Sequence, residues 1–182
     1  PFACAAGVRG AVDLSEQAGP QCAGPCAAGT YRQDTSEVEC RPCPAAAFCP
    51  PGAATPLLCP GGTYANATGA ASAAECNSTA PGFFAPLGSV TPTPCAAGTV
   101  APRGSLERCE PCASGTFQDG VGNVTCRPCP TGAFCPLGAA TPIPCPDGQY
   151  GNGTGATAAA ECDACPPGSW CNSGQAFPCG VG

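Results

Sequence analysis

The 182-residue sequence contains no histidine, no lysine and no methionine, and twelve acidic residues outnumber its six arginines. Without histidine the chain has no imidazole base, no Ser-His or Cys-His nucleophile pair and no imidazole metal ligand. The missing lysine also removes Schiff-base chemistry. Six arginines provide too little positive charge to attract a nucleic-acid backbone. We therefore expect a protein that is not an enzyme, carries no cofactor and binds no nucleic acid.

Large apolar side chains are also scarce, since Leu, Ile, Val and Phe account for only 22 of the 182 residues. That number is too small for a core of ordinary size. An uncharged stretch at 42–74 has six prolines among its first 19 residues, which excludes a membrane helix there. We expect no membrane insertion by this segment. Because the sequence begins at Pro1 and lacks methionine, we also expect a fragment or a processed product.

Cysteine, glycine and proline are abundant instead, with 19 Cys, 26 Gly and 24 Pro. A cysteine content of about a tenth exceeds the ~8–10 % that marks a disulfide scaffold. In chains of this kind, cross-links formed in an oxidising compartment replace the missing core. The composition therefore predicts a disulfide-bonded protein.

An internal duplication organises the cysteines. Residues 40–76 align without a gap on residues 126–162, at an offset of 86, and 26 of the 37 positions are identical. Such self-similarity is the signature of a repeat architecture. We therefore divide the chain into two cysteine-rich super-repeats, 4–94 and 95–178, and expect 179–182 to begin a truncated third repeat.

The super-repeats contain long units that open with Cys-x-x-Gly and close at a second cysteine 14 to 18 positions later. The glycine indicates a positive φ or a close backbone approach. In four of the long units an aromatic residue follows two positions later (Tyr31, Tyr64, Phe117 and Tyr150), and we expect its ring to cover the nearby disulfide. The long units are Cys4–Cys22, Cys26–Cys40, Cys59–Cys76, Cys95–Cys109, Cys112–Cys126 and Cys145–Cys162.

Short units have their two cysteines six positions apart, with an aromatic residue just before the second. The intact copies are Cys43–Cys49, Cys129–Cys135 and Cys165–Cys171. A fourth copy, Thr79–Ala85, keeps Phe84 but lacks both cysteines. Joint loss is expected for two cysteines that bond to each other, because losing only one would leave an unpaired thiol.

Pairing the cysteines within units predicts nine disulfides and leaves Cys179 over. Closing a loop of ~15 residues stabilises a fold by ~3 kcal/mol in the chain-entropy model. Cys179 follows Phe177 and Pro178 where another repeat would open, so its partner is expected beyond Gly182 or in a neighbouring subunit. The predicted pairs are Cys4–Cys22, Cys26–Cys40, Cys43–Cys49, Cys59–Cys76, Cys95–Cys109, Cys112–Cys126, Cys129–Cys135, Cys145–Cys162 and Cys165–Cys171.

Two other uses of cysteine fit parts of this pattern. One set of four has the spacing of a zinc site, and an equivalent set occurs earlier in the chain. The CxxC pairs also resemble redox-active motifs, although proline-rich loops lack the strand-to-helix context that such motifs need. The joint cysteine loss favours disulfides, so we expect no metal. The two sets are Cys109, Cys112, Cys126 and Cys129, and Cys22, Cys26, Cys40 and Cys43.

Four Asn-x-Ser/Thr sequons predict N-glycosylation at Asn66, Asn77, Asn123 and Asn152. Asn66 and Asn152 occupy equivalent positions in the two super-repeats. Recurring Thr-Pro and Ala-Pro dipeptides predict stiff, extended turns between loops. Hydroxyproline glycosylation is a further expectation, at Pro56, Pro92, Pro94 and Pro142.

The sequence as a whole predicts a small disulfide-rich fold that is mostly irregular, with short β-hairpins. Strands of two to four residues are expected around the Gly-Thr-Tyr positions, and a helical turn at 71–75 and at 157–161. If each stapled loop touches its neighbours, the tandem cysteine-rich repeats form an elongated rod.

The run Cys-Pro-x-Gly-x-Phe-Cys-Pro-x-Gly-x-x-x-Pro-x-Pro-Cys-Pro-x-Gly-x-Tyr, from Cys129 to Tyr150, resembles the cysteine-rich repeats of the ephrin-receptor-like family. The long units are similar to the single-disulfide modules of tumour-necrosis-factor receptors and of growth-factor-receptor cysteine-rich regions. The resemblance covers nearly the whole chain and implies an extracellular segment with a ladder of disulfides. The Thr79–Ala85 unit departs from it by one rung.

The bias toward Ala, Gly and Pro, with Arg but no Lys, is similar to that of green-algal cell-surface glycoproteins, among them the mastigoneme proteins of flagellar hairs. This resemblance implies a structural glycoprotein that builds a filament or matrix at the cell or flagellar surface. Its partners would be its own copies or related matrix glycoproteins, together with covalent glycans. The alternative is a ligand-binding or spacer stalk of a cell-surface receptor or adhesion protein. A filament subunit predicts self-contacts, whereas a stalk predicts a monomeric segment.

Overall fold

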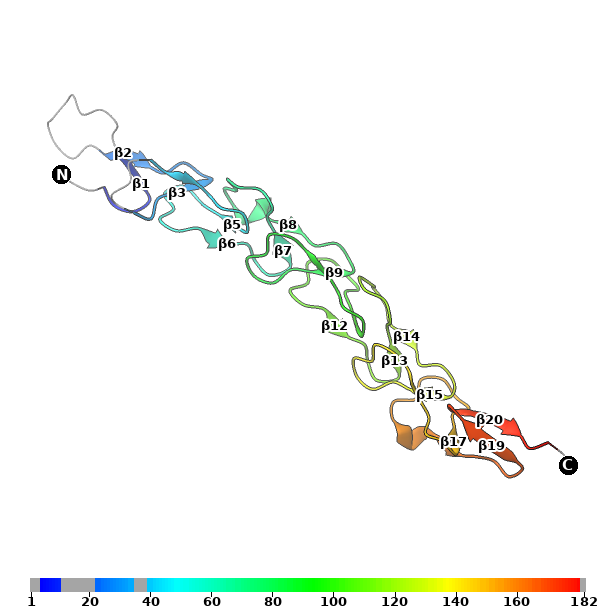
Figure 1. Ribbon diagram of the computed structural model, residues 1–182. Helices are drawn as coiled ribbons and strands as arrows, with labels where there is room; N and C mark the ends of the chain where they lie inside the picture. Colours follow the sequence, from blue (N-terminus) through cyan, green and yellow to red (C-terminus); the bar gives the residue numbers. More distant parts are fainter. Residues whose placement is uncertain (1–3, 11–21, 35–38, 181–182) are drawn as a thin grey trace. The chain divides into compact units, whose positions relative to one another are not determined.

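The computed structural model describes residues 4–10, 22–34 and 39–180, and these form short strands with irregular connections (Figure 1). Every strand in this part of the chain belongs to a two-stranded sheet. The strands are β1 (Val8–Gly10), β2 (Cys22–Pro25), β3 (Thr30–Tyr31), β4 (Arg41–Pro42), β5 (Ala47–Phe48), β6 (Leu57–Leu58), β7 (Thr63–Tyr64), β8 (Asn77–Ser78), β9 (Phe83–Phe84), β10 (Thr93–Pro94), β11 (Thr99–Val100), β12 (Glu110–Pro111), β13 (Thr116–Phe117), β14 (Arg127–Pro128), β15 (Ala133–Phe134), β16 (Ile143–Pro144), β17 (Gln149–Tyr150), β18 (Asp163–Ala164), β19 (Ser169–Asn172) and β20 (Gln175–Pro178). Single turns of 3-10 helix, η1 (Ala73–Glu75) and η2 (Ala159–Glu161), lie where the sequence predicts helical turns. The predicted fold class, disulfide-rich with short hairpins, is confirmed.

The described chain divides into two compact units. Unit 1 contains the described residues up to Thr79, together with Phe84–Thr93 and Ser105–Glu107. Unit 2 contains Ala80–Phe83, Pro94–Gly104 and the described residues from Arg108 onward. Within each unit the hairpins follow one another in chain order, such as β3, β5 and β7 in unit 1 and β13, β15 and β17 in unit 2 (Figure 1). The super-repeat boundary at 94 and 95 remains a prediction, and residues 181 and 182 of the predicted third repeat lie outside the described residues.

Long and short units share one local structure, so both are called modules here. A module starts at an opening residue, which begins a tight turn. The third residue after it has a positive φ, between 68° and 85°, and leads into a short strand. The opening residues are Cys4, Cys26, Cys43, Cys59, Thr79, Cys95, Cys112, Cys129, Cys145 and Cys165. The third residues are Gly7, Gly29, Ala46, Gly62, Gly82, Gly98, Gly115, Gly132, Gly148 and Gly168.

The third residue joins its module to the next one through the backbone. The N–H of Gly115 donates to the carbonyl of Cys135 at 2.8 Å, and its carbonyl accepts the N–H of Cys129 at 2.8 Å. Gly29 makes the same two bonds with the following short module, also at 2.8 Å. Because both partners lie in the following module, these bonds order the modules along each unit.

The third residue also approaches the backbone of the module after next. A Cβ added to Gly115 would lie only 2.4 Å from the carbonyl oxygen of Gly155. Glycine is therefore needed here for two reasons, since a side chain would meet both an unfavourable φ and a backbone carbonyl.

A hairpin ties each module to the opening of the next. In unit 2, β13 pairs antiparallel with β14, which directly precedes Cys129, so that Phe117 lies opposite Arg127. The Arg127 guanidinium carbon lies 4.8 Å from the centre of the Phe117 ring, and the same guanidinium pairs with Asp119.

Buried half-cystines and alanines form the small cores. In unit 2, Phe117 packs against Cys129, Ala133, Cys135 and Ala139. In unit 1, Tyr31 packs against the equivalent residues of the Cys43 module, and Phe48 packs against the Cys59–Cys76 disulfide and Ala65. Each of these rings therefore covers the disulfide of the following module rather than that of its own.

One buried charge reinforces the start of unit 1. The Arg32 side chain is only 1 % exposed, and its guanidinium donates to the backbone carbonyls of Cys4, Val8 and Asp34. Carbonyl oxygens at three sites around the guanidinium offset the cost of burying it. In unit 2, Gln118 directly follows Phe117, as Arg32 directly follows Tyr31. The Gln118 side-chain amide donates to the Thr125 carbonyl at 2.7 Å.

Substituting Gly115 with alanine should destabilise the fold by about 2–4 kcal/mol, the combined cost of a left-handed alanine and of overpacking. The matched variant Ala46→Gly should stay within ~1 kcal/mol of the wild type, because relief at φ 68° offsets the lost methyl burial. Denaturant unfolding followed by circular dichroism, with disulfides intact, measures both. Equal losses in the two variants would contradict this account of the third residue.

Candidate functional site

The structure pairs eighteen cysteines into nine disulfides, with Cα–Cα distances of 5.7 to 5.9 Å. These are the pairs predicted from the sequence, and each closes a loop within one module. The disulfides are Cys4–Cys22, Cys26–Cys40, Cys43–Cys49, Cys59–Cys76, Cys95–Cys109, Cys112–Cys126, Cys129–Cys135, Cys145–Cys162 and Cys165–Cys171.

The cysteines with zinc-like spacing are all half-cystines. Cys109 is bonded to Cys95, Cys112 to Cys126, and Cys129 lies in a third disulfide. The earlier set of the same spacing is likewise divided among three disulfides. Within residues 4–10, 22–34 and 39–180, no three His, Cys, Asp or Glu side chains are grouped as a metal site would need. Sulfurs that bond to each other are not thiolate ligands.

Cys179 is exposed and has no disulfide in the structure. Its N–H donates to the carbonyl of Gly168 at 2.8 Å, which is the bond that an opening half-cystine such as Cys129 makes with the preceding third residue. Cys179 therefore has the backbone position of an opening residue. Nearby, the Trp170 side chain is 52 % exposed and stacks on Phe177, with ring centres 4.7 Å apart. The partner of Cys179 remains a prediction.

The Thr79–Ala85 module keeps the shape of a short module without its disulfide. Thr79 and Ala85 are only 3 % and 0 % exposed, at the positions of the two half-cystines. The Thr79 hydroxyl accepts the N–H of Ser105 at 3.0 Å, and Ser105 itself has a positive φ of 60°. Ser105 lies 26 residues along the chain, and the sequence gives no signal for this contact.

The four predicted N-glycosylation sites lie in different surroundings. Asn66 and Asn152 are exposed in loops outside the strands, and the threonines that complete their sequons are exposed as well. Asn77 is exposed but belongs to β8, whose Thr79 neighbour is buried. Asn123 is half-buried, and its amide donates to the Val121 carbonyl at 3.4 Å.

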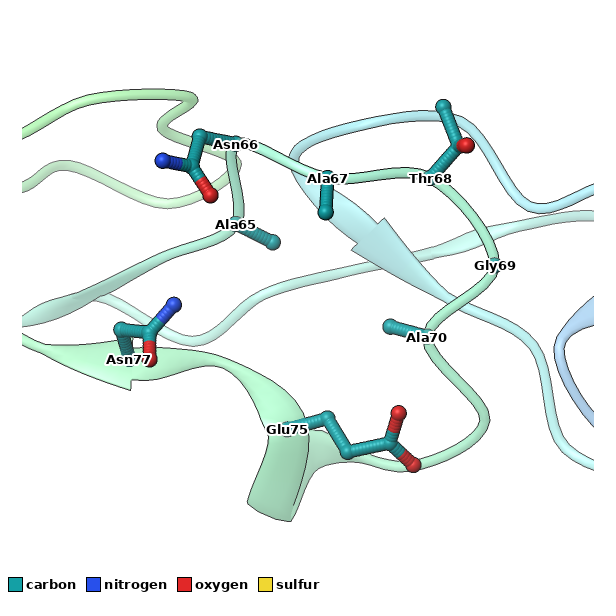
Figure 2. A pocket seen from close by; sticks show the side chains of 8 residues that line it. All are labelled: Ala65, Asn66, Ala67, Thr68, Gly69, Ala70, Glu75 and Asn77. Atoms are coloured by element: carbon teal, nitrogen blue, oxygen red, sulfur yellow. The ribbon is translucent and has the colours of Figure 1, made fainter.

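Two of these sequons line one shallow hollow of about 120 Å³ in unit 1. Figure 2 shows Asn66 and Asn77 on either side of Ala65, with the Glu75 carboxylate directed toward the Gly69–Ala70 side. Small residues form most of the rest of the lining, and these are Ala65, Ala67, Thr68, Gly69 and Ala70. The lining therefore consists of methyl and backbone groups together with two amides and one carboxylate.

The carboxylate of this hollow has an equivalent in unit 2. Glu75 accepts the N–H of Ala71 at 3.2 Å, and Glu161 accepts both the hydroxyl and the N–H of Thr157. The Thr157 hydroxyl, followed by its N–H, holds the pKa of Glu161 below the ordinary value of a glutamate. Both carboxylates therefore act locally to close a loop.

The prolines predicted to carry hydroxyproline glycans lie at strand entrances. Pro56, Pro92 and Pro142 are half-buried and directly precede β6, β10 and β16, while Pro94 is exposed within β10. Pro94 is therefore the most accessible of the four.

Residues 98–142 match the family model described as tyrosine-protein kinase ephrin type A/B receptor-like. No curated protein matches the sequence. The match and the nine disulfides define a chain of cysteine-rich repeats of extracellular type, similar to those of receptor ectodomains. This disulfide content is typical of extracellular or secreted proteins. Across the described residues, the structure contains no helix with the length and apolarity that a membrane span needs.

Replacing both Thr79 and Ala85 with cysteine should restore the missing disulfide, because the module keeps the shape of the intact short modules. In those three modules the Cα atoms of the two half-cystines lie 5.7 to 5.8 Å apart. We expect one alkylatable thiol, that of Cys179, and a stabilisation of roughly 2 kcal/mol. Mass spectrometry after alkylation of the native protein measures the thiols. The single variant Thr79→Cys should show two, and three thiols in the double variant would contradict the prediction.

Proposed function

We propose that this chain is a segment of an extracellular structural glycoprotein, a rod of tandem modules that builds a filament or matrix at the cell or flagellar surface. In this role the segment has no catalytic activity, and its partners are its own copies or related matrix glycoproteins. Cross-linked loops in tandem would keep such a segment extended without a conventional core.

The observation that carries the proposal is the backbone connection between successive modules. At Gly29 in unit 1 and at Gly115 in unit 2, the third residue bonds twice to the next module. The hairpins, and rings such as those of Tyr31 and Phe117, add further contacts between a module and the one that follows it. Repetition of one junction is how solenoid proteins obtain length, since every module contacts its neighbours in the same way.

The surface also favours a glycosylated structural role. Only 10 % of the residues are charged, so glycans would supply much of the hydration of this surface. The sequons of Asn66 and Asn152 are exposed at equivalent places in the two super-repeats. Sequons at regular intervals would coat successive repeats with sugar.

A receptor or adhesion stalk is the second candidate. It is favoured by the match of residues 98–142 to the ephrin-receptor-like family model, which is named after a receptor. A stalk would use the same modules as a spacer or would bind a protein ligand through one face.

Native, unreduced protein distinguishes the two candidates. A filament subunit should carry sugar at Asn66 or Asn152 by peptide mass spectrometry and should form oligomers whose size rises with concentration in sedimentation velocity. A segment that bears no glycan and stays monomeric at all concentrations would contradict the structural role and favour the stalk. The variant Cys179→Ser separates non-covalent assembly from disulfide-linked dimers.

A further inference from the structure

The threonine of the Asn77 sequon occupies a position at which the other super-repeat has a half-cystine. Asn77, Ser78 and Thr79 align at the offset of 86 with Asp163, Ala164 and Cys165. The substitution that removes a disulfide from the short module therefore also completes an acceptor sequon.

Folding closes this sequon. Asn77 and Ser78 form β8, which pairs with β7, and the N–H of Thr79 donates to the Gly62 carbonyl at 3.1 Å. The hydroxyl of Thr79, the group that defines an Asn-x-Thr sequon, is buried and accepts the N–H of Ser105 at 3.0 Å. A transferase that must recognise this hydroxyl cannot reach it in the folded chain.

The equivalent sequons at Asn66 and Asn152 are open. In each, both the asparagine and the threonine two residues later are exposed, and neither lies in a strand. Folding leaves these acceptors accessible.

The module that closes the Asn77 sequon is the one without a disulfide. Its backbone bonds include Gly82 N–H to the Ala101 carbonyl at 2.9 Å and Ala85 N–H to the Leu106 carbonyl at 3.0 Å. No disulfide joins residues between Cys76 and Cys95, so the segment opens when these hydrogen bonds break. Local opening of this kind costs less free energy than global unfolding.

We propose that Asn77 is a folding-gated N-glycosylation site, modified only while the Thr79–Ala85 module is open, whereas Asn66 and Asn152 stay accessible after folding. The inference rests on the proposed role as a glycoprotein. In the transfer, the Asn77 side-chain nitrogen bonds to the anomeric carbon of a lipid-diphosphate-linked oligosaccharide. The bond from that carbon to the diphosphate oxygen breaks, the nitrogen loses one proton, and the lipid diphosphate leaves. Occupancy of Asn77 thus records whether sugar transfer preceded folding.

Transfer to the folded protein tests the gate. Unglycosylated protein with its disulfides intact is incubated with purified oligosaccharyltransferase and lipid-linked oligosaccharide, and site occupancy is followed by peptide mass spectrometry. We expect Asn66 and Asn152 to be modified at least about tenfold faster than Asn77, since transfer at Asn77 waits for local opening. The reduced and alkylated chain should remove this difference.

Two matched glycine substitutions locate the gate without touching a sequon. In Gly82→Ala the new Cβ would lie 2.2 Å from the Gly122 carbonyl oxygen, and in Gly132→Ala it would lie 2.8 Å from that of Gly174. The φ angles are 85° at Gly82 and 79° at Gly132, but only Gly82 lies in the disulfide-free module. Gly82→Ala should raise the rate at Asn77 by at least about tenfold, the effect of a ~1.4 kcal/mol easier opening, and Gly132→Ala should leave it unchanged.

Three results would overturn the proposal: equal rates at Asn77 and Asn66 in the folded wild type, an equal acceleration by Gly132→Ala, or no transfer to Asn66 and Asn152 in the folded chain. A native protein without sugar would contradict the proposed function instead. That failure is separate, because the gate is measured by transfer to purified protein.

Discussion

The backbone turn at the start of each module is the constraint on which the rest of the structure depends. It holds the third residue at a positive φ, and from Gly7 to Gly148 both the N–H and the carbonyl of that residue bond to the following module. At Gly115 the same conformation leaves no room for a side chain, because the Gly155 carbonyl of the module after next lies against it. Close backbone contact of this kind needs no large apolar residues, which this chain has in small number.

Disulfides and inter-module hydrogen bonds have separate tasks. Each disulfide closes a loop inside one module and limits the freedom of the unfolded chain. The hydrogen bonds join consecutive modules, and the Thr79–Ala85 module shows that the joint does not need the disulfide. Thr79 and Gly82 make there the backbone bonds that a half-cystine and a glycine make elsewhere. Disulfide-bonded modules precede and follow it in the sequence. Opening of the Thr79–Ala85 module itself would expose the Asn77 sequon.

The disulfide pairing could be predicted because the sequence contains several copies of each module that can be compared with one another. The joint loss of cysteine at Thr79 and Ala85 linked two cysteine positions directly. The short hairpins followed from the same spacing. What each ring covers could not be predicted, because the offset that places Phe117 over the Cys129–Cys135 disulfide arises only when modules meet. The turn shared by long and short modules does have a sequence signal, since Gly82, Gly132 and Gly168 stand at the third position of three short modules and Ala46 takes that position in the fourth. The contact of Thr79 with Ser105 spans 26 residues and has no sequence signal.

A chain built in this way is a series of disulfide-closed modules of extracellular type that are joined through their backbones. The central claim is that backbone bonds between modules, and not disulfides alone, order the chain. Amide hydrogen exchange of the oxidised protein tests it most directly, at Gly29, Gly98 and Gly115. The account predicts exchange at least ~100-fold slower than in an unstructured chain, because each N–H is bonded to the next module. Exchange at the unstructured rate, with every disulfide intact, would contradict it.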